Sequence, residues 1–100
     1  MNDLQYKTYA VTNEIDLNKI AVECGIKKKY TWEEPLILHG PVLERILGEH
    51  SGENEKVMVF SFGSIVFINS GMNHTEIFMK YLKKIKPDID IEHFDRFKDD

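Results

Sequence analysis

The strongest hydrophobic pattern in the chain lies between residues 56 and 69. Two apolar runs, residues 57–62 and 65–68, flank the pair Gly63–Ser64. A two-residue connection that begins with glycine is typical of a type II′ β-hairpin turn. Because both runs are apolar at nearly every position, they are typical of strands that are covered on both faces. The pattern predicts a hairpin whose second face is hidden by a partner or another segment; the alternative is an unusually apolar exposed face.

The N-terminal segment predicts a strand followed by a short helix. Residues 6–12 are mostly β-branched or aromatic, which favours a strand. Asp16 then stands where a helix N-cap belongs, and Gly25 stands where a C′ glycine belongs. Four apolar residues between them share one helical face: Leu17, Ile20, Ala21 and Cys24.

The most regular helical pattern follows the hairpin. Asn73 with Glu76 three residues later matches a capping box, in which asparagine takes the serine or threonine role. The predicted buried stripe consists of Ile77, Phe78, Tyr81, Leu82 and Ile85. Pro87 ends this helix, and the alternating residues 88–92 predict an edge strand with one wet face.

Residues 26–55 are less regular. The short apolar segment 36–38 is either a strand or a piece of chain that packs on the core. Pro41 is well placed in the first turn of a helix that ends near Gly48, and residues 49–55 have the polar composition of an exposed loop.

The order of these elements is strand, helix, insert, strand, strand, helix, strand. It predicts one α+β domain over residues 1–100 with a ferredoxin-like βαββαβ sandwich. An antiparallel sheet would carry the helices on one face, and an insert would follow the first helix. In the usual order of that fold the first and third strands are central, so residues 65–69 are expected inside the sheet.

The charge, the length of the apolar stretches and the cysteine content limit which partners and cellular locations are expected. The formal net charge is −4 and the isoelectric point is about 5.5, which disfavours a nucleic-acid partner held by bulk charge. The longest apolar stretch is too short to cross a bilayer, so membrane contact is expected only through a segment outside this chain. A single cysteine allows no internal disulfide and favours a cytoplasmic location.

No catalytic constellation stands out. The four histidines form no short metal-ligand spacing, so neither a metal nor another cofactor is expected. Cys24 falls at the C-terminal end of a predicted helix, where the dipole disfavours a thiolate, and a buried inert cysteine is favoured. The chain is therefore not expected to be an enzyme.

The weak binding candidates are Trp32, Glu33, Glu34, Asn69 and His74. A tryptophan beside two carboxylates suits a recognition loop, and paired carboxylates suit acid–base chemistry. Adjacent residues of an extended segment point in opposite directions, however. The pattern favours a tryptophan packed on the core with solvated glutamates.

Three segments together resemble a known family. They are residues 9–20, residues 32–36, and residues 60–69 followed by the helix that carries Glu76 and Phe78. The ordered set resembles the required-for-meiotic-nuclear-division family, also called Sad1-interacting factor-like proteins, over most of residues 6–95. The resemblance implies a link to membranes and mitochondria in eukaryotes and, in one animal branch, to mitochondrial translation.

Members of that family are longer and have a helical C-terminal region that often holds a hydrophobic segment. The resemblance therefore implies either a short relative or the N-terminal part of a longer, membrane-tethered protein. The family has no established catalytic motif, so no active-site residue is implied for this chain.

The leading functional prediction is a non-catalytic domain that acts through a protein partner or as a homo-oligomer. It depends on the apolar hairpin, whose second face needs a cover. A small-ligand sensor is the second hypothesis, and a pocket lined by Trp32, Glu34, Asn69 or His74 would favour it. An RNA- or ribosome-associated factor is the third, and only the family resemblance suggests it.

Overall fold

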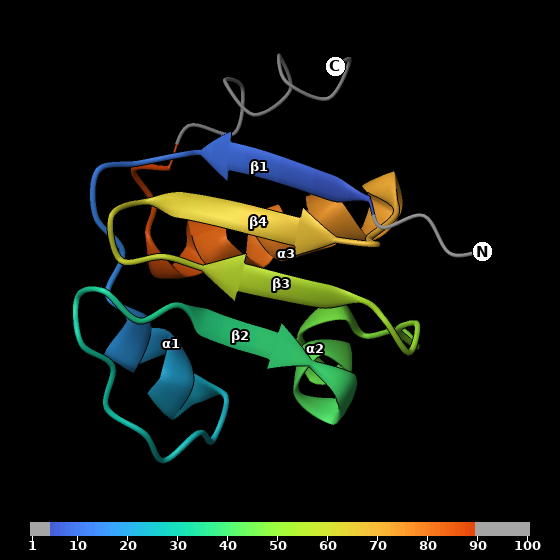
Figure 1. The fold of residues 1–100 in the computed structure, drawn as a ribbon, viewed down its shortest axis with the longest axis horizontal. Helices are drawn as coiled ribbons and strands as arrows, with labels where there is room; N and C mark the ends of the chain where they lie inside the picture. Colours follow the sequence, from blue (N-terminus) through green and yellow to red (C-terminus); the bar gives the residue numbers. More distant parts are fainter. Residues whose placement is uncertain (1–4, 90–100) are drawn as a thin grey trace.

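The computed structural model describes residues 5–89, which form one antiparallel sheet and a layer of helices (Figure 1). In chain order the elements are β1 (Tyr6–Ala10), α1 (Leu17–Glu23), β2 (Leu36–His39), α2 (Gly40–Leu47), β3 (Lys56–Val59), β4 (Ser64–Ile68) and α3 (Met72–Ile85). The four strands lie in the order β1-β4-β3-β2, and every neighbouring pair is antiparallel. The predicted α+β class is confirmed.

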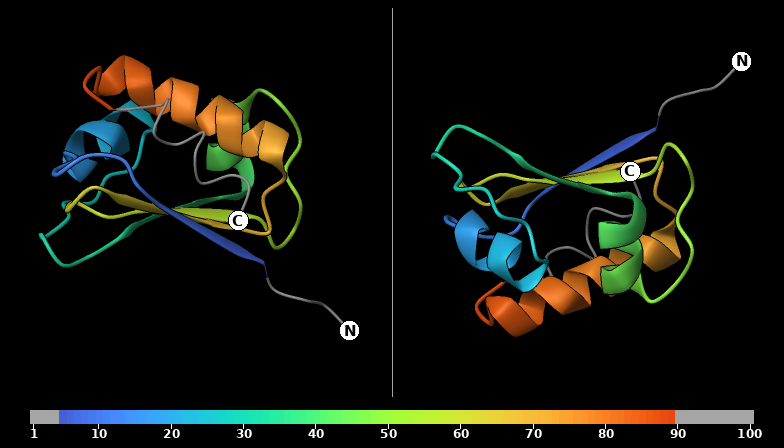
Figure 2. Two further views of the ribbon diagram at one scale, coloured as in Figure 1. Left: turned by 90° about the horizontal axis from the view of Figure 1, so that it is seen from above. Right: turned by 90° about the horizontal axis from the view of Figure 1, so that it is seen from below.

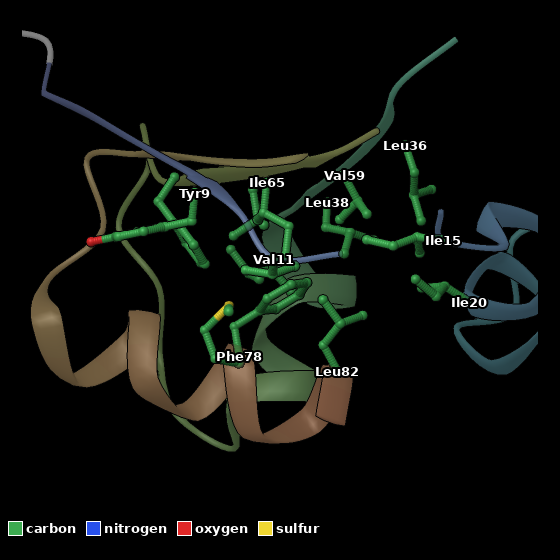
Figure 3. Close-up of a cluster of buried hydrophobic side chains, with 14 of the residues drawn as sticks. Tyr9, Val11, Ile15, Ile20, Leu36, Leu38, Val59, Ile65, Phe78 and Leu82 are labelled. Atoms are coloured by element: carbon green, nitrogen blue, oxygen red, sulfur yellow. The ribbon is translucent and has the colours of Figure 1, made fainter. Parts of the chain in front are cut away.

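The helices lie on one side of the sheet, as the two side views show (Figure 2). Side chains alternate along a strand, so every second strand residue points toward the helices. Figure 3 shows strand residues such as Ile65 and Val59 meeting Phe78 and Leu82 of α3 in this layer. The core therefore lies entirely between the sheet and the helices.

The local signals of the first unit are confirmed. The Asp16 carboxylate accepts hydrogen bonds from the backbone N–H groups of Asn18 and Lys19, at 3.1 and 3.2 Å. At the other end, Cys24 is the C-cap and Gly25 follows with a φ of 76°. These short-range contacts determine where α1 begins and ends.

The insert contributes its own strand and helix. The segment 36–39 forms β2, which pairs with β3 so that Leu36 lies opposite Val59. It continues directly into α2, with Pro41 in the first turn and the left-handed Gly48 at its end, as predicted. The strand alternative for residues 36–38 is therefore the correct one.

The predicted two-residue hairpin turn is wrong. The ladder extends beyond β3, because the N–H of Phe60 donates to the carbonyl of Ser64 at 2.9 Å. The N–H of Gly63 then donates back to the carbonyl of Phe60 at 2.9 Å. Gly63 has a φ of 96°, so the connection is a three-residue loop that ends in a left-handed glycine.

This turn is also where the segment after β1 attaches to the hairpin. The N–H groups of Val11 and Ile15 donate to the carbonyls of Gly63 and Ser61, at 3.0 and 2.8 Å. A Cβ atom on Gly63 would lie 1.8 Å from the carbonyl oxygen of Thr12. Glycine is required here both by its conformation and by this close approach of two backbones.

The predicted capping box of the last helix is wrong. The helix begins at Met72, its N-cap is Gly71, and Thr75 Oγ1 donates back to the Gly71 carbonyl at 2.9 Å. Asn73 lies inside the first turn, and its amide donates instead to Glu49 at 3.4 Å. The predicted end is correct, since α3 stops before Pro87.

The predicted strand over residues 88–92 lies mostly outside the described residues. Asp88 belongs to a turn, and Ile89 is fully buried without strand pairing. Strand β4 is central, as expected, but β1 has β4 as its only neighbour within residues 5–89. The described part of the chain therefore does not establish the ferredoxin-like order.

The face of the sheet opposite the helices is apolar and partly exposed within the described residues. It consists of Tyr6, Thr8, Ala10, Ile37, His39, Lys56, Met58, Ser64, Val66 and Ile68, which we call the open face. Val57 and Val59 are almost fully buried, whereas Met58 between them is half-buried and Ile37 beside it is 45% exposed. Every helix within residues 5–89 packs on the same side of the sheet, so none of them covers the open face. That a partner or another segment hides this face stays a prediction.

The close approach at Gly63 yields a stability prediction. Replacing Gly63 with alanine is expected to lower the free energy of unfolding by about 2 kcal/mol or more, since φ is left-handed and the new methyl group meets a backbone oxygen. Chemical denaturation checks the loss. The control is Gly52→Ala, where a Cβ atom meets nothing within 4 Å. Equal stability of the two variants would contradict the prediction.

Candidate functional site

The five candidate residues lie in two groups at opposite ends of the sheet. Trp32, Glu33 and Glu34 belong to the loop before β2, beside the hairpin turn, whereas Asn69 and His74 lie where β4 leads into α3 (Figure 1). The structure therefore does not join them into one pocket.

Asn69 holds chain segments together. Its Oδ1 accepts a hydrogen bond from the N–H of Gln5 at 3.0 Å, and its Nδ2 donates to the carbonyl of Asn54 at 3.3 Å. It also adopts a left-handed φ of 55°, which asparagine tolerates better than most residues. Each end of its side chain thus makes one hydrogen bond to the backbone, so Asn69 has a structural role, and its predicted binding role stays a prediction.

His74 lies between two carboxylates. Its Nδ1 is 2.9 Å from Glu55 Oε2, and its Nε2 is 2.9 Å from Glu49 Oε1. The Glu55 side chain is only 4% exposed and that of His74 is 18% exposed. A ring with a carboxylate at each nitrogen is best satisfied as an imidazolium, which donates on both sides.

The charge state of His74 follows from this arrangement. Burial pushes the pKa of His74 down, but the hydrogen bonds and charges of Glu55 and Glu49 outweigh it and raise the pKa above 6.5. Because both ring nitrogens are occupied, His74 has no free nitrogen for a ligand. The cluster therefore links the loop after α2 to the first turn of α3.

The same loop is held at further points. The N–H of Gly52 donates to Glu55 at 3.2 Å, and the N–H of Ser51 donates to Glu44 at 2.9 Å. The hydrogen bond from the N–H of Ser51 lowers the pKa of Glu44, and the charge of His50 makes a smaller contribution in the same direction. Sequence reasoning missed Glu49 and Glu55 because they stand 25 and 19 residues from His74 and share no local motif with it.

Trp32 is on the surface, not packed on the core, so that prediction is wrong. Its side chain is 55% exposed. The loop around it is nevertheless held in place: Ser61 Oγ donates to the Trp32 carbonyl, and the N–H of Tyr30 donates to Asn18 Oδ1 at 2.8 Å. Backbone contacts therefore determine the position of Trp32, while its ring stays accessible.

The two neighbouring glutamates differ. Glu34 accepts from the N–H of Thr31 at 3.1 Å and pairs with Lys28 Nζ at 3.2 Å. The Thr31 hydrogen bond, followed by the Lys28 contact, lowers the pKa of Glu34. Glu33 is exposed to solvent. The carboxylates therefore do not act as a catalytic pair, since one belongs to the loop structure and the other points into water.

A cavity of about 140 Å³ lies beside Trp32. Ile15 and Leu17 lie in its lining but are nearly fully buried, so its accessible apolar surface comes mainly from the rings of Tyr30 and Trp32. Glu14 is the one ionisable carboxylate in its lining. Of the predicted site residues, Trp32 alone lines this cavity.

A second cavity, of about 180 Å³, lies between α1, α2 and α3 and includes Cys24, Arg45 and Tyr81. Cys24 is buried, as predicted, with its Sγ 3.8 Å from the Tyr81 hydroxyl. Burial and then the contact with Cys24 raise the pKa of Tyr81 above its usual range. Arg45 donates to the Cys24 carbonyl at 3.2 Å, so the polar groups here serve the packing of the helices.

Two further findings bear on function. Within residues 5–89, no group of three or more histidine, cysteine, aspartate and glutamate side chains is arranged to hold a metal ion. None of the helices in that range is long and apolar enough to cross a membrane.

No family model, no curated protein and no solved structure matches this chain. The family resemblance based on the three sequence segments therefore stays a prediction.

The His74 cluster gives a pH-dependent prediction. Its pKa is raised in the folded state, so its stabilising effect is complete below about pH 6.5 and is lost as the pH rises through the folded-state value. His74→Gln is expected to lower the free energy of unfolding by about 2 kcal/mol at pH 6, because buried Glu55 loses its cationic partner and keeps only the N–H of Gly52. The difference from the wild type should shrink at higher pH.

Denaturation curves between pH 5.5 and 9 measure this difference. The control is His50→Gln, since the His50 side chain is 93% exposed beside Glu44 and should change stability little. A cost of His74→Gln that stays constant across this pH range would contradict the assigned charge of the imidazole.

Proposed function

We propose that the protein is a non-catalytic self-association domain, in which the open face of the sheet binds the open face of a second copy. The observation that carries the proposal is a row of side chains that crosses all four strands. Thr8 lies opposite Val66, Val66 opposite Met58, and Met58 opposite Ile37. No member of this row is charged.

The physical reason is the cost of leaving such a row in water. A sheet with one wet face usually alternates apolar and polar positions, so that its outer residues are polar. Here the outer positions of the central pair β3–β4 are Lys56, Met58, Ser64, Val66 and Ile68, and the three apolar ones among them, Met58, Val66 and Ile68, are each half-buried. Covering apolar area contributes about 25 cal/mol per Å², so a second apolar face would stabilise the pair.

Charge placement favours a second copy as the occupant. Lys56 and His39 lie exposed at one end of the open face. The opposite end of β2 is preceded by exposed Glu33. If a two-fold axis crosses the strands at right angles within the interface, the Lys56 end of each copy faces the Glu33 end of the other. Such a contact is self-complementary, as a closed dimer requires.

The non-catalytic part of the proposal is supported by the polar groups themselves. His74 uses both ring nitrogens on Glu49 and Glu55, and Cys24 is buried at the C-terminal end of α1. A base or nucleophile needs an accessible atom beside its substrate. Neither side chain offers one.

The proposal also includes a fold family, a protein family and a cellular location. We place the chain in a ferredoxin-like fold, supported by β1, β3, β4 and α3, with β2 and α2 as the insert. Membership of the required-for-meiotic-nuclear-division family is supported by the three resembling segments, and a cytoplasmic location by the single cysteine. The RNA- or ribosome-associated role rests on that resemblance alone.

A charge placed in the uncharged row that crosses the four strands, which includes Ile37, tests self-association. The wild type is expected to show a mass that rises with concentration in analytical ultracentrifugation. Ile37→Glu should weaken the dimer at least tenfold, because a buried unpaired carboxylate is costly. The matched control is Val22→Glu on α1, which replaces an equally apolar residue that is 76% exposed. A wild type that stays monomeric up to about 1 mM would contradict the proposal.

The antiparallel arrangement is tested by exchanging charges. Lys56→Glu and Glu33→Lys should each weaken the dimer about threefold, since each places like charges at both ends of the interface. The double variant restores the opposite pairing and should recover wild-type association. Additive weakening in the double variant would show that these ends do not face each other.

A further inference from the structure

We propose that the cavity beside Trp32 binds an alkylammonium group, such as the end of a lysine side chain or a small primary amine. This inference is independent of self-association, because the cavity is lined by residues at the start of α1, in the helix layer, and the open face lies on the other side of the sheet.

The cavity has a fixed shape. Three segments meet around it: the residues that lead into α1, the loop of Tyr30 and Trp32, and the hairpin turn. The N–H of Ile15 donates to the Ser61 carbonyl at 2.8 Å, and the Ser61 hydroxyl donates to the Trp32 carbonyl. Ser61 is 6% exposed, so one buried residue holds two walls together. A ligand would meet a site that is already formed.

The hydrogen-bonding groups of the lining are largely used by the protein. Asn18 Oδ1 accepts from the N–H of Tyr30, and the Ser61 hydroxyl donates to Trp32. Glu14 is exposed, and its carboxylate is the charge that remains available in the lining. The negative charge of Asp16, which caps α1, lies two residues away in the chain. The site therefore favours a cation over an anion.

The rings select the kind of cation. A cation that approaches an aromatic face is attracted by the ring quadrupole, most strongly for tryptophan. Lys28 shows this preference within the chain, since its Nζ lies 4.9 Å from the centroid of the Tyr30 ring. That lysine is neutralised by Glu34 at 3.2 Å, so it leaves the charge of Glu14 uncompensated.

The size of the cavity limits the ligand. At about 30 Å³ per water molecule, 140 Å³ holds roughly five water-sized groups. A butyl chain with a terminal ammonium group has this size. The accessible rings of Trp32 and half-buried Tyr30 offer surface to the methylene groups, and Glu14 offers its carboxylate to the charged end.

The test uses n-butylammonium chloride as the probe, followed through the backbone amide signals of Tyr30, Thr31 and Ser61 in NMR spectra. Saturable shifts with a dissociation constant on the order of millimolar are expected. Sodium chloride and n-butanol at equal concentrations are the comparison solutes. Equal saturation by n-butanol, or no saturation by butylammonium, would overturn the proposal.

Variants locate the site. Trp32→Ala should abolish the saturable shifts while leaving the fold intact, because the Ser61 contact uses the backbone carbonyl of Trp32. Glu14→Gln should weaken binding about threefold, as expected for an exposed ion pair. The matched control Glu53→Gln, on an exposed loop outside the lining, should bind as the wild type does. Unchanged binding by Trp32→Ala would overturn the assignment.

A second pair of probes distinguishes the source of the group. An Nα-acetylated lysine amide that binds at least as tightly as butylammonium would identify a lysine side chain of a peptide as the ligand. Binding of butylammonium alone would identify a free amine. Failure of both would remove the ammonium site and leave the self-association proposal untouched.

Discussion

The packing of all three helices on one face of the sheet is the constraint on which the rest of the structure depends (Figure 2). Strand side chains alternate between faces, so an apolar hairpin covered on one side buries only half of its residues. Val57, Ile65 and Phe67 enter the core, whereas Met58 and Val66 remain on the other face. The open apolar face is thus a direct result of one-sided helix packing, and it supports an interaction role.

Each end of the sheet is closed by hydrogen bonds between segments that are distant in the sequence. At the hairpin turn, Ser61 joins Ile15, in the segment that leads into α1, to the loop of Trp32. At the other end, His74 joins Glu49 and Glu55. In each place one polar side chain is buried, Ser61 or Glu55, and it finds hydrogen-bond partners, as groups removed from water must. The accessible chemistry is left to exposed rings, lysines and carboxylates, which suits recognition better than catalysis.

The two proposed binding surfaces depend on different interactions: burial of apolar area on the open face, and attraction of a cation at the cavity. The open face offers broad apolar area with charges at its ends, which suits a flat macromolecular partner. The cavity beside Trp32 offers a small aromatic site with one available carboxylate, which suits a single charged group. The two surfaces come close together only at the Trp32 loop, where Glu33 faces the proposed dimer and Trp32 lines the cavity.

Features that depend on neighbours in the chain could be predicted from the sequence. Short-range backbone preferences account for the Asp16 cap, the Gly25 and Gly48 helix ends, Pro41 in the first turn of α2 and the approximate position of the hairpin. The α+β class followed from the order of these elements.

Only the tertiary structure decided which segments meet. It alone placed β2 beside β3, brought His74 between two glutamates, and began α3 at Met72, with Asn73 donating to Glu49 instead of capping the helix. It also left Trp32 in solvent, against expectation, since the loop is held by its backbone. Local preferences act over a few residues, whereas these contacts join residues far apart in the sequence, and their energies depend on how the whole sheet and its helices pack.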